Sequence, residues 1–211
     1  MHSQTAYGVA MAQATLVANG IGVSMTFETG SGITIARRTL VANFMKSNCD
    51  FAWWVDSDMS FPADAPLKLL RRGVPLVGCN YRKRYFPNPH FTAMNGEPGK
   101  TVEYKTEAAS PEMERVDCIP HGMMLVHRSV YERVPGPHYI FEYNENHTME
   151  VGEDYYFCAK ARKHGIDVWC DNDLSRQIAH IGICNFDPGM TQVVTAIKDG
   201  VIPGIIPSSS K

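Results

Sequence analysis

The sequence predicts an α/β fold in which helices flank a mixed, mainly parallel central sheet. Short apolar runs of strand length alternate with stretches of helical length in the first half of the chain. Such alternation is typical of strand–helix–strand units. The runs at residues 51–55 and 75–79 are almost wholly apolar, as expected for strands that are covered by helices on both faces.

The first half of the chain carries start and stop signals for each expected helix. Gly20 ends the first helix, Ser31 can cap the second, and Pro62 stands at a favourable early position of the third. The expected helices cover residues 5–19, 31–47 and 62–72, and the expected strands cover residues 21–27, 51–55 and 75–79.

The second half of the chain is less regular. Residues 80–117 are rich in Pro, Asn, Gly, Lys and Glu, which favours an excursion with hairpins over a second domain. Strands are expected at residues 90–94, 115–119, 123–127 and 167–169, and helices at residues 129–134 and 153–164. We expect one domain over residues 1–187 and a C-terminal tail over residues 188–211, with a disordered Ser-Ser-Ser-Lys end.

Composition narrows the class of protein. The net charge is −2 and the pI is about 6.4, so the overall charge does not indicate nucleic-acid binding, although a local basic patch stays open. No run approaches the roughly 18 apolar residues of a membrane span. Residues 6–18 are weakly apolar, but no Lys or Arg precedes them, so we expect an amphipathic helix and not a signal peptide.

The six cysteines are scattered and form no CxxC pair. Several of them lie inside apolar runs. We therefore expect buried free thiols in a reducing cytoplasm, and neither disulfides nor a zinc site.

The strongest chemical signal is Asp56-Ser57-Asp58, which directly follows the apolar run at residues 51–55. Acids at the end of a buried strand lie where α/β folds bind ligands, and they need a compensating charge. Oxygen ligands suit Mg²⁺ or Mn²⁺, which also bind substrate phosphates. The alternative is structural: an N-cap with an acid in the first turn of the next helix.

A second acidic pair, Glu153-Asp154, follows Gly152 and opens the expected helix at residues 153–164. Acids at this position match the helix dipole and need no further role. In the functional interpretation, one of them is a general base at the rim of a cleft, directed at an acceptor hydroxyl.

His180 lies in the apolar segment Ile178-Ala179-His180-Ile181 after the acidic helix. Such a histidine is usually a core or surface residue with its hydrogen bonds satisfied. Because it follows the acidic helix and a short strand, the chain can also bring it beside Asp56 and Asp58, where it would complete a metal site. Histidine is a better ligand for Mn²⁺ than for Mg²⁺.

Basic and glycine residues supply further candidates. Arg37, early in the second expected helix, can pair with a diphosphate. Lys83, within Arg82-Lys83-Arg84 after the strand at residues 75–79, can bind phosphate of a donor or of a nucleic acid. Gly122 permits close approach of a ligand. Each is equally compatible with a solvated surface or a plain turn.

Together and in this order, these segments resemble the GT-A glycosyltransferases, and they are most similar to small phage-associated members of the family-2-like group. The resemblance covers residues 2–182. It is carried by seven segments: His2-Ser3-Gln4-Thr5, Ile35-Ala36-Arg37-Arg38, Asp56-Ser57-Asp58, Gly78-Cys79-Asn80-Tyr81-Arg82-Lys83, His121-Gly122-Met123-Met124, Gly152-Glu153-Asp154 and Ala179-His180-Ile181-Gly182.

The resemblance implies a Rossmann-like GT-A fold, a UDP-sugar donor and a bound Mn²⁺ or Mg²⁺. Asp58 and His180 would be the metal ligands, with Asp56 on the ribose or in the metal shell. Arg37 would approach the nucleotide, with Lys83 and Gly122 also on the donor side. Asp154 or Glu153 would supply the catalytic base of an inverting transfer.

Phage members of this group are associated with sugar addition to hydroxylated pyrimidines in DNA. The resemblance therefore implies a hydroxymethylated pyrimidine in DNA as the leading acceptor, and a cytoplasmic enzyme, in the host cytoplasm if it is phage-encoded. Three alternatives stay open: a glycan or protein acceptor, a non-catalytic sugar-nucleotide-binding relative, and a nucleotidyltransferase of the same fold.

The chain departs from the family pattern at its start. Members begin with a strand and a Pro/Gly loop, whereas Met1 falls inside that loop, so the usual first strand is expected to be lacking. Either the reading frame is truncated or another segment fills the place. Residues 201–206 are apolar, but Pro203 disfavours a central strand there. Arg38 also stands where relatives often carry asparagine.

Overall fold

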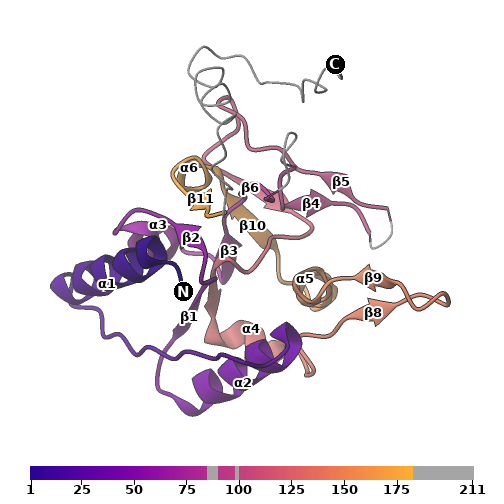
Figure 1. The fold of residues 1–211 in the computed structure, drawn as a ribbon, viewed down its shortest axis with the longest axis horizontal. Coiled ribbons are helices and arrows are strands. Elements are labelled where there is room, and N and C mark those ends of the chain that lie inside the picture. The colour runs from indigo at the N-terminus through magenta and orange to yellow at the C-terminus, as the bar shows by residue number, and fades with distance from the viewer. Residues whose placement is uncertain (85–89, 98–99, 183–211) are drawn as a thin grey trace, which may run out of the picture.

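The computed structural model describes residues 1–84, 90–97 and 100–182, and it has helices on both sides of a central five-stranded sheet (Figure 1). The strands, in spatial order, are β1 (Phe51–Val55), β7 (Met123–His127), β3 (Leu76–Gly78), β10 (Val168–Asp171) and β6 (Met113–Val116). The expected α/β class with flanking helices is confirmed.

The expected predominance of parallel pairing is not found. Only β3 and β10 pair in parallel, whereas β1 with β7, β7 with β3, and β10 with β6 are antiparallel. The reason is that β7 inserts between β1 and β3 in the opposite direction. Because β1, β3 and β10 still run the same way, their carboxyl ends meet at one edge of the sheet, where ligands bind in such folds.

Each face of the sheet packs against its own helices. One core joins β7 residues Met124 and Val126 to α4 (Arg128–Arg133) and α5 (Glu153–Lys163). The other joins Met123 and Leu125 to α3 (Ala65–Arg71) and α6 (Asn172–Ser175). This division follows from strand geometry, because successive side chains point to opposite faces.

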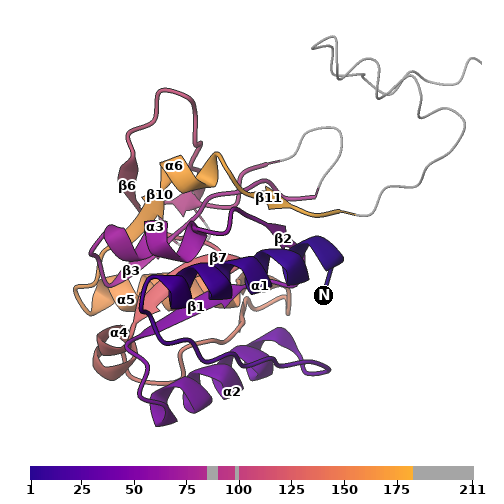
Figure 2. The same ribbon diagram turned by 90° about the vertical axis from the view of Figure 1, so that its left-hand side faces the viewer.

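Strand β1 is less covered than expected. Only Trp54 among its five residues is buried, and Phe51 is exposed, whereas β3 is buried throughout. The cause is its position, since β1 ends the sheet and no strand in the described part of the chain pairs with its outer edge. The long helices α1 (Ser3–Ala18) and α2 (Ile33–Lys46) lie on opposite sides of it (Figure 2).

The strand expected at residues 21–27 does not form, and these residues are irregular. Their alternating apolar pattern predicts a strand, but a strand also needs a hydrogen-bonding neighbour, and β1 does not provide one here. As a result Met25 and Phe27 are exposed. The alternation of apolar residues was therefore not enough to predict a strand at residues 21–27.

The remaining elements follow the expected order with shifted ends. α2 begins after Gly32, and Ser31 donates to Glu28 and does not cap the helix. The region 80–117 holds the expected hairpin, formed by β4 (Met94–Asn95) and β5 (Val102–Glu103), but β6 leaves it to become an edge of the main sheet. The small pairs β2 (Met59–Ser60) with β11 (Ala179–His180), and β8 (Glu142–Tyr143) with β9 (Met149–Val151), complete the fold.

Two further expectations concern single features. The five cysteines in the described ranges, Cys49, Cys79, Cys118, Cys158 and Cys170, are free, and all except Cys49 are buried. Cys184 and the expected tail at residues 188–211 lie outside the described residues. Across the described residues, none of the helices has the length and apolarity that crossing a membrane requires.

Candidate functional site

The candidate site lies where β1 ends. After Val55 the chain turns through Asp56, Ser57 and Asp58 and enters β2, which pairs with β11 so that Met59 faces His180. This pairing brings His180 beside Asp58, although the two are far apart in the sequence. The arrangement expected for the acid pair and His180 is therefore present in the fold.

Asp58 and His180 present an oxygen and a ring nitrogen to each other. His180 Nδ1 lies 3.2 Å from the carbonyl oxygen of Arg82. Because a carbonyl oxygen only accepts, Nδ1 carries a hydrogen, and the other ring nitrogen, Nε2, faces Asp58 Oδ2 at 3.3 Å. A carboxylate oxygen and an imidazole nitrogen at this distance can share a proton, and both are also common metal ligands. A backbone carbonyl on the other ring nitrogen is also the usual support of a metal-binding histidine.

Arg37 connects the two acidic pairs. Its Nε donates to Glu153 Oε1 at 3.2 Å, and its Nη2 lies 3.7 Å from Asp56 Oδ1. The side chain is buried, and its guanidinium lies 5.8 Å from the ring centre of Trp54. Burial alone would lower the pKa of Arg37, but the surrounding negative charge, that of Asp56 first, raises it overall. Arg37 thus fixes the start of α5 against the end of β1.

The carboxyl groups of the site are held in a partly dehydrated setting. Burial raises the pKa of Asp56, while Arg37 opposes that rise. Burial, followed by the charge of Glu153, raises the pKa of Asp154 to about 6, with Arg37 again opposing. Asp154 accepts from the amide of Tyr155 at 2.8 Å and keeps some solvent exposure. A carboxylate with this pKa can accept a proton near neutral pH.

Gly122 forms the floor beside the acid pair. Its carbonyl oxygen accepts from the amide of Asp56 at 3.1 Å, and its amide donates to the Tyr81 hydroxyl at 3.1 Å. A methyl group at this position would collide with the Tyr81 hydroxyl and lie 3.2 Å from Asp56 Oδ2. The site therefore requires glycine here for close packing against Tyr81 and Asp56, and the expected approach of a ligand stays a prediction.

Lys83 is the one sequence candidate that the structure leaves apart from the others. It is exposed on the segment after β3, its amide donates to the carbonyl oxygen of His90 at 2.7 Å, and its side chain makes no ion pair with another candidate residue. No group of three or more His, Cys, Asp or Glu side chains in the described ranges is arranged to hold a metal ion. A metal at this site would therefore have two protein ligands, Asp58 and His180.

Sequence reasoning missed a buried chain of hydrogen bonds behind the site. Trp54 Nε1 donates to the Tyr131 hydroxyl at 2.9 Å, the hydroxyls of Tyr131 and Tyr139 lie 2.9 Å apart, and Tyr139 contacts His121 Nε2 at 2.8 Å. Burial lowers the pKa of His121 and keeps the ring neutral. These aromatic residues look like ordinary core in the sequence, and no local signal distinguishes them.

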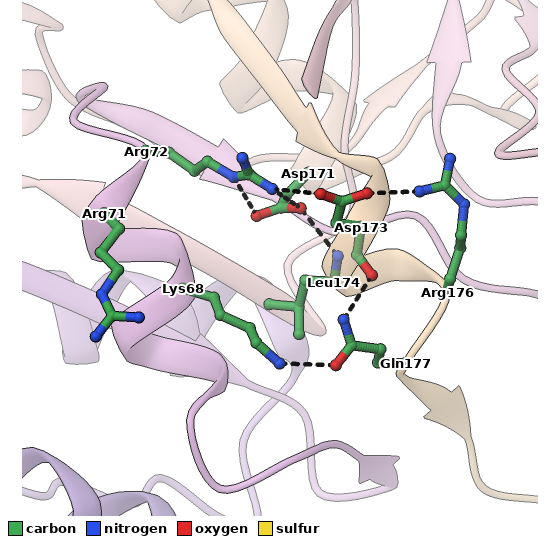
Figure 3. A pocket seen from close by; sticks show the side chains of 8 residues that line it. All are labelled: Lys68, Arg71, Arg72, Asp171, Asp173, Leu174, Arg176 and Gln177. Atoms are coloured by element: carbon green, nitrogen blue, oxygen red, sulfur yellow. Dashed lines mark hydrogen bonds and ion pairs between the residues drawn. The ribbon is translucent and has the colours of Figure 1, made fainter. Parts of the chain in front are cut away.

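A pocket between α3 and α6 contains none of the predicted site residues. Eight residues line it: Lys68, Arg71, Arg72, Asp171, Asp173, Leu174, Arg176 and Gln177 (Figure 3). Arg72 holds Asp171 through two hydrogen bonds of 2.8 and 2.9 Å, and Asp171 Oδ1 accepts from the amide of Leu174 at 2.9 Å. These contacts cap α6 and join it to α3, so we assign them a structural role.

Comparisons with known proteins show the fold and no family. No family model matches the chain, and no curated protein matches it. Among solved structures, the chain is similar to the crystal structure of A197 from STIV, with a TM-score of 0.50 and 13% sequence identity. The match covers 84% of this chain and 90% of that chain. At this level of identity the likeness supports the mixed α/β architecture only.

Proposed function

We propose that this protein is a metal-dependent glycosyltransferase that moves a sugar from a UDP-sugar to an acceptor hydroxyl. The observation that carries the proposal is the facing pair of Asp58 Oδ2 and His180 Nε2, 3.3 Å apart, beside the arrangement in which Arg37 joins Asp56 to Glu153. The first pair suits a divalent cation, and the second connects it to acids at the start of α5.

The residues present fit the cation that the proposal requires. Asp58 and His180 would hold it, and the mixed oxygen and nitrogen donors favour Mn²⁺ over Mg²⁺. When bound, the ion supplies positive charge that neutralises the diphosphate leaving group. Asp56 lies next to this pair and would bind the donor ribose, with Arg37 holding its carboxylate in place.

Of the two candidate bases, the contacts favour Asp154. Glu153 is engaged by Arg37, whereas Asp154 accepts only from backbone at its own helix start and has a pKa of about 6. In the proposed step Asp154 takes the proton of the acceptor hydroxyl. The hydroxyl oxygen bonds to the anomeric carbon as the bond from that carbon to the diphosphate breaks.

A hydroxymethylated pyrimidine in DNA is the proposed acceptor. Support comes from Arg82, Lys83 and Arg84, which are all exposed on one segment of the chain. Arg84 contacts Asp58 directly, and the carbonyl of Arg82 contacts His180. Cationic side chains at the rim of the site suit a phosphate backbone. A glycan or protein acceptor, and a relative that binds sugar nucleotides without turnover, are alternatives that the following assay separates.

The test measures UDP release with Mn²⁺ and a panel of UDP-sugars, with and without hydroxymethylated DNA. We expect release that depends on the DNA. Asp58→Asn and Asp154→Asn should each reduce it by about 10²-fold or more, and Asp64→Asn, at a half-exposed carboxylate outside the site, should not. Release without DNA would favour another acceptor, and binding without any release would favour the non-catalytic alternative. Full activity of Asp58→Asn would exclude the metal assignment.

A further inference from the structure

Arg84 already occupies the carboxylate oxygen that a metal ion would need. Its Nη1 lies 2.9 Å from Asp58 Oδ2, and this same oxygen faces His180 Nε2 at 3.3 Å. Arg84 Nη1 also lies 3.4 Å from the carbonyl oxygen of Ile181. The guanidinium therefore interacts with the Asp58 turn and with the segment that follows His180, the two parts of the chain that would supply the metal ligands.

A guanidinium and a divalent ion are poor neighbours at one oxygen. Both are positive, and at a separation of a few ångströms their repulsion is strong in a partly buried site. A side chain that titrates near neutral pH can give up a proton to make room for a metal ion. Arg84 has no such option, since arginine stays protonated in proteins. It can only move away from Asp58.

The setting of Arg84 allows such a movement. Its side chain is half exposed, while that of Asp58 is largely buried, with exposed fractions of 50% and 16%. A Cβ at Gly182 would lie 3.5 Å from Cδ and 3.7 Å from Cγ of Arg84, so glycine at this position leaves room beside the aliphatic part of Arg84. A long, half-exposed side chain can reach solvent without disturbing the core.

We propose that Arg84 is a displaceable counter-ion of Asp58, and that a divalent cation must expel it to bind between Asp58 and His180. This inference rests on the proposed metal site. In the metal-free protein, Arg84 neutralises Asp58 through the ion pair between them. Its displacement opposes metal binding, so Arg84 sets the affinity of the site for the ion.

The test is binding of Mn²⁺ alone, followed by the electron paramagnetic resonance signal of the free ion, with no nucleotide present. Arg84→Met keeps an unbranched apolar stem in place of the arginine stem and removes the charge. We expect this variant to bind Mn²⁺ about tenfold more tightly than the unmodified chain, because the competing cation is gone. Lys83→Met removes the same charge from the adjacent exposed residue, which does not contact Asp58, and should change the affinity by less than about threefold.

The outcomes separate this inference from the proposed function. If the unmodified chain binds Mn²⁺ and Asp58→Asn does not, the metal site is supported. If, in that case, Arg84→Met binds Mn²⁺ no more tightly than the unmodified chain, the role of Arg84 as a counter-ion is rejected and the metal site is not. Equal gains in Arg84→Met and Lys83→Met would also reject it, because a general charge effect would explain both. If Mn²⁺ binds to none of these proteins, the metal site and the counter-ion are rejected together. Thermal unfolding of each variant verifies that it is folded.

Discussion

At the scale of single residues, the site depends on carboxyl groups that are partly removed from water. Asp154 shows the effect most clearly, since its pKa is raised from 3.8 to about 6. Burial is the main cause, the neighbouring charge of Glu153 adds to it, and Arg37 acts in the opposite direction. The same burial that prepares Asp154 to accept a proton also means that its charged form lowers the free energy of unfolding.

This cost predicts a pH-dependent gain in stability for Asp154→Asn. A folded-state pKa above the unfolded value means that the stability contribution of Asp154 is full below about pH 4 and is lost as the pH rises through about 6. A shift of this size corresponds to about 3 kcal/mol, and the remaining solvent exposure reduces the expected effect to about 2 kcal/mol. At pH 8 the variant should therefore have the larger free energy of unfolding.

Urea unfolding at pH 4 and pH 8 measures this difference. The gain should be present at pH 8 and absent at pH 4. Asp64→Asn, at a half-exposed carboxylate that pairs with Lys68, serves as the control and should not show such a pH-dependent gain. A gain of equal size at both pH values would mean that the charge of Asp154 is not its source.

Gly122 is the second residue whose role can be isolated. Gly122→Ala should lower the free energy of unfolding by about 2 kcal/mol, because the new methyl group would collide with the Tyr81 hydroxyl. Gly22→Ala is the matched control, since a methyl group there meets nothing within 4 Å.

A double variant tests whether this collision is the cause. In the Tyr81→Phe background, part of the loss caused by Gly122→Ala should be recovered, because the hydroxyl that it strikes has been removed. Chemical denaturation of the four proteins gives the coupling energy. Strict additivity of the two substitutions would show that Gly122 and Tyr81 do not meet.

At the scale of elements, helix α6 is too short to be stable by itself and is held in place by specific polar contacts. Helix α6 has only four residues, and its start is capped by Asp171, which accepts from the amide of Leu174. Asp171 is fully buried, and Arg72 at the end of α3 neutralises it through two hydrogen bonds. A buried carboxylate needs such a partner. Asp171 and Arg72 together hold α3 and α6 in place, next to the segment that carries His180.

Loss of the charge at Asp171 should therefore destabilise the protein. Asp171→Asn keeps an oxygen for the cap of α6 but leaves Arg72 without its main partner, and we expect a loss of about 2–4 kcal/mol in the free energy of unfolding. Glu112→Gln removes another partner of Arg72 whose side chain is 78% exposed, and it should cost less than about 0.5 kcal/mol. Equal losses in the two variants, measured by urea unfolding, would contradict the structural role of the Arg72–Asp171 pair.

At the scale of the whole molecule, the site depends on three strands with a common direction. β1, β3 and β10 end at one edge of the sheet, and β7 and β6 run the other way between and beside them. This mixed order leaves the acid pair of β1 and the segment after β3 close to each other. The return strand β11 then adds His180 from the far end of the described chain.

The sequence predicted most helices and buried strands because their signals are local. Apolar runs marked β3 and β7, and Gly165 followed the end of α5 as expected. The strand expected at residues 21–27 failed because pairing requires a neighbour that a local pattern does not reveal. The predominance of parallel pairing failed for a similar reason, since the direction of β7 depends on the course of the excursion before it.

The sequence by itself determined which residues have the chemistry: the acids at the end of β1, the acids that open α5, Arg37 and His180. Only the tertiary structure decided how they meet. Arg37 and Glu153 are 116 residues apart in the sequence, and Asp58 meets His180 only because β2 pairs with β11. Residue types and local periodicity specify donors, acceptors and elements, whereas distances between remote side chains follow from the packing of the whole sheet. For the same reason, the contact of Arg84 with Asp58 became visible only in the folded chain.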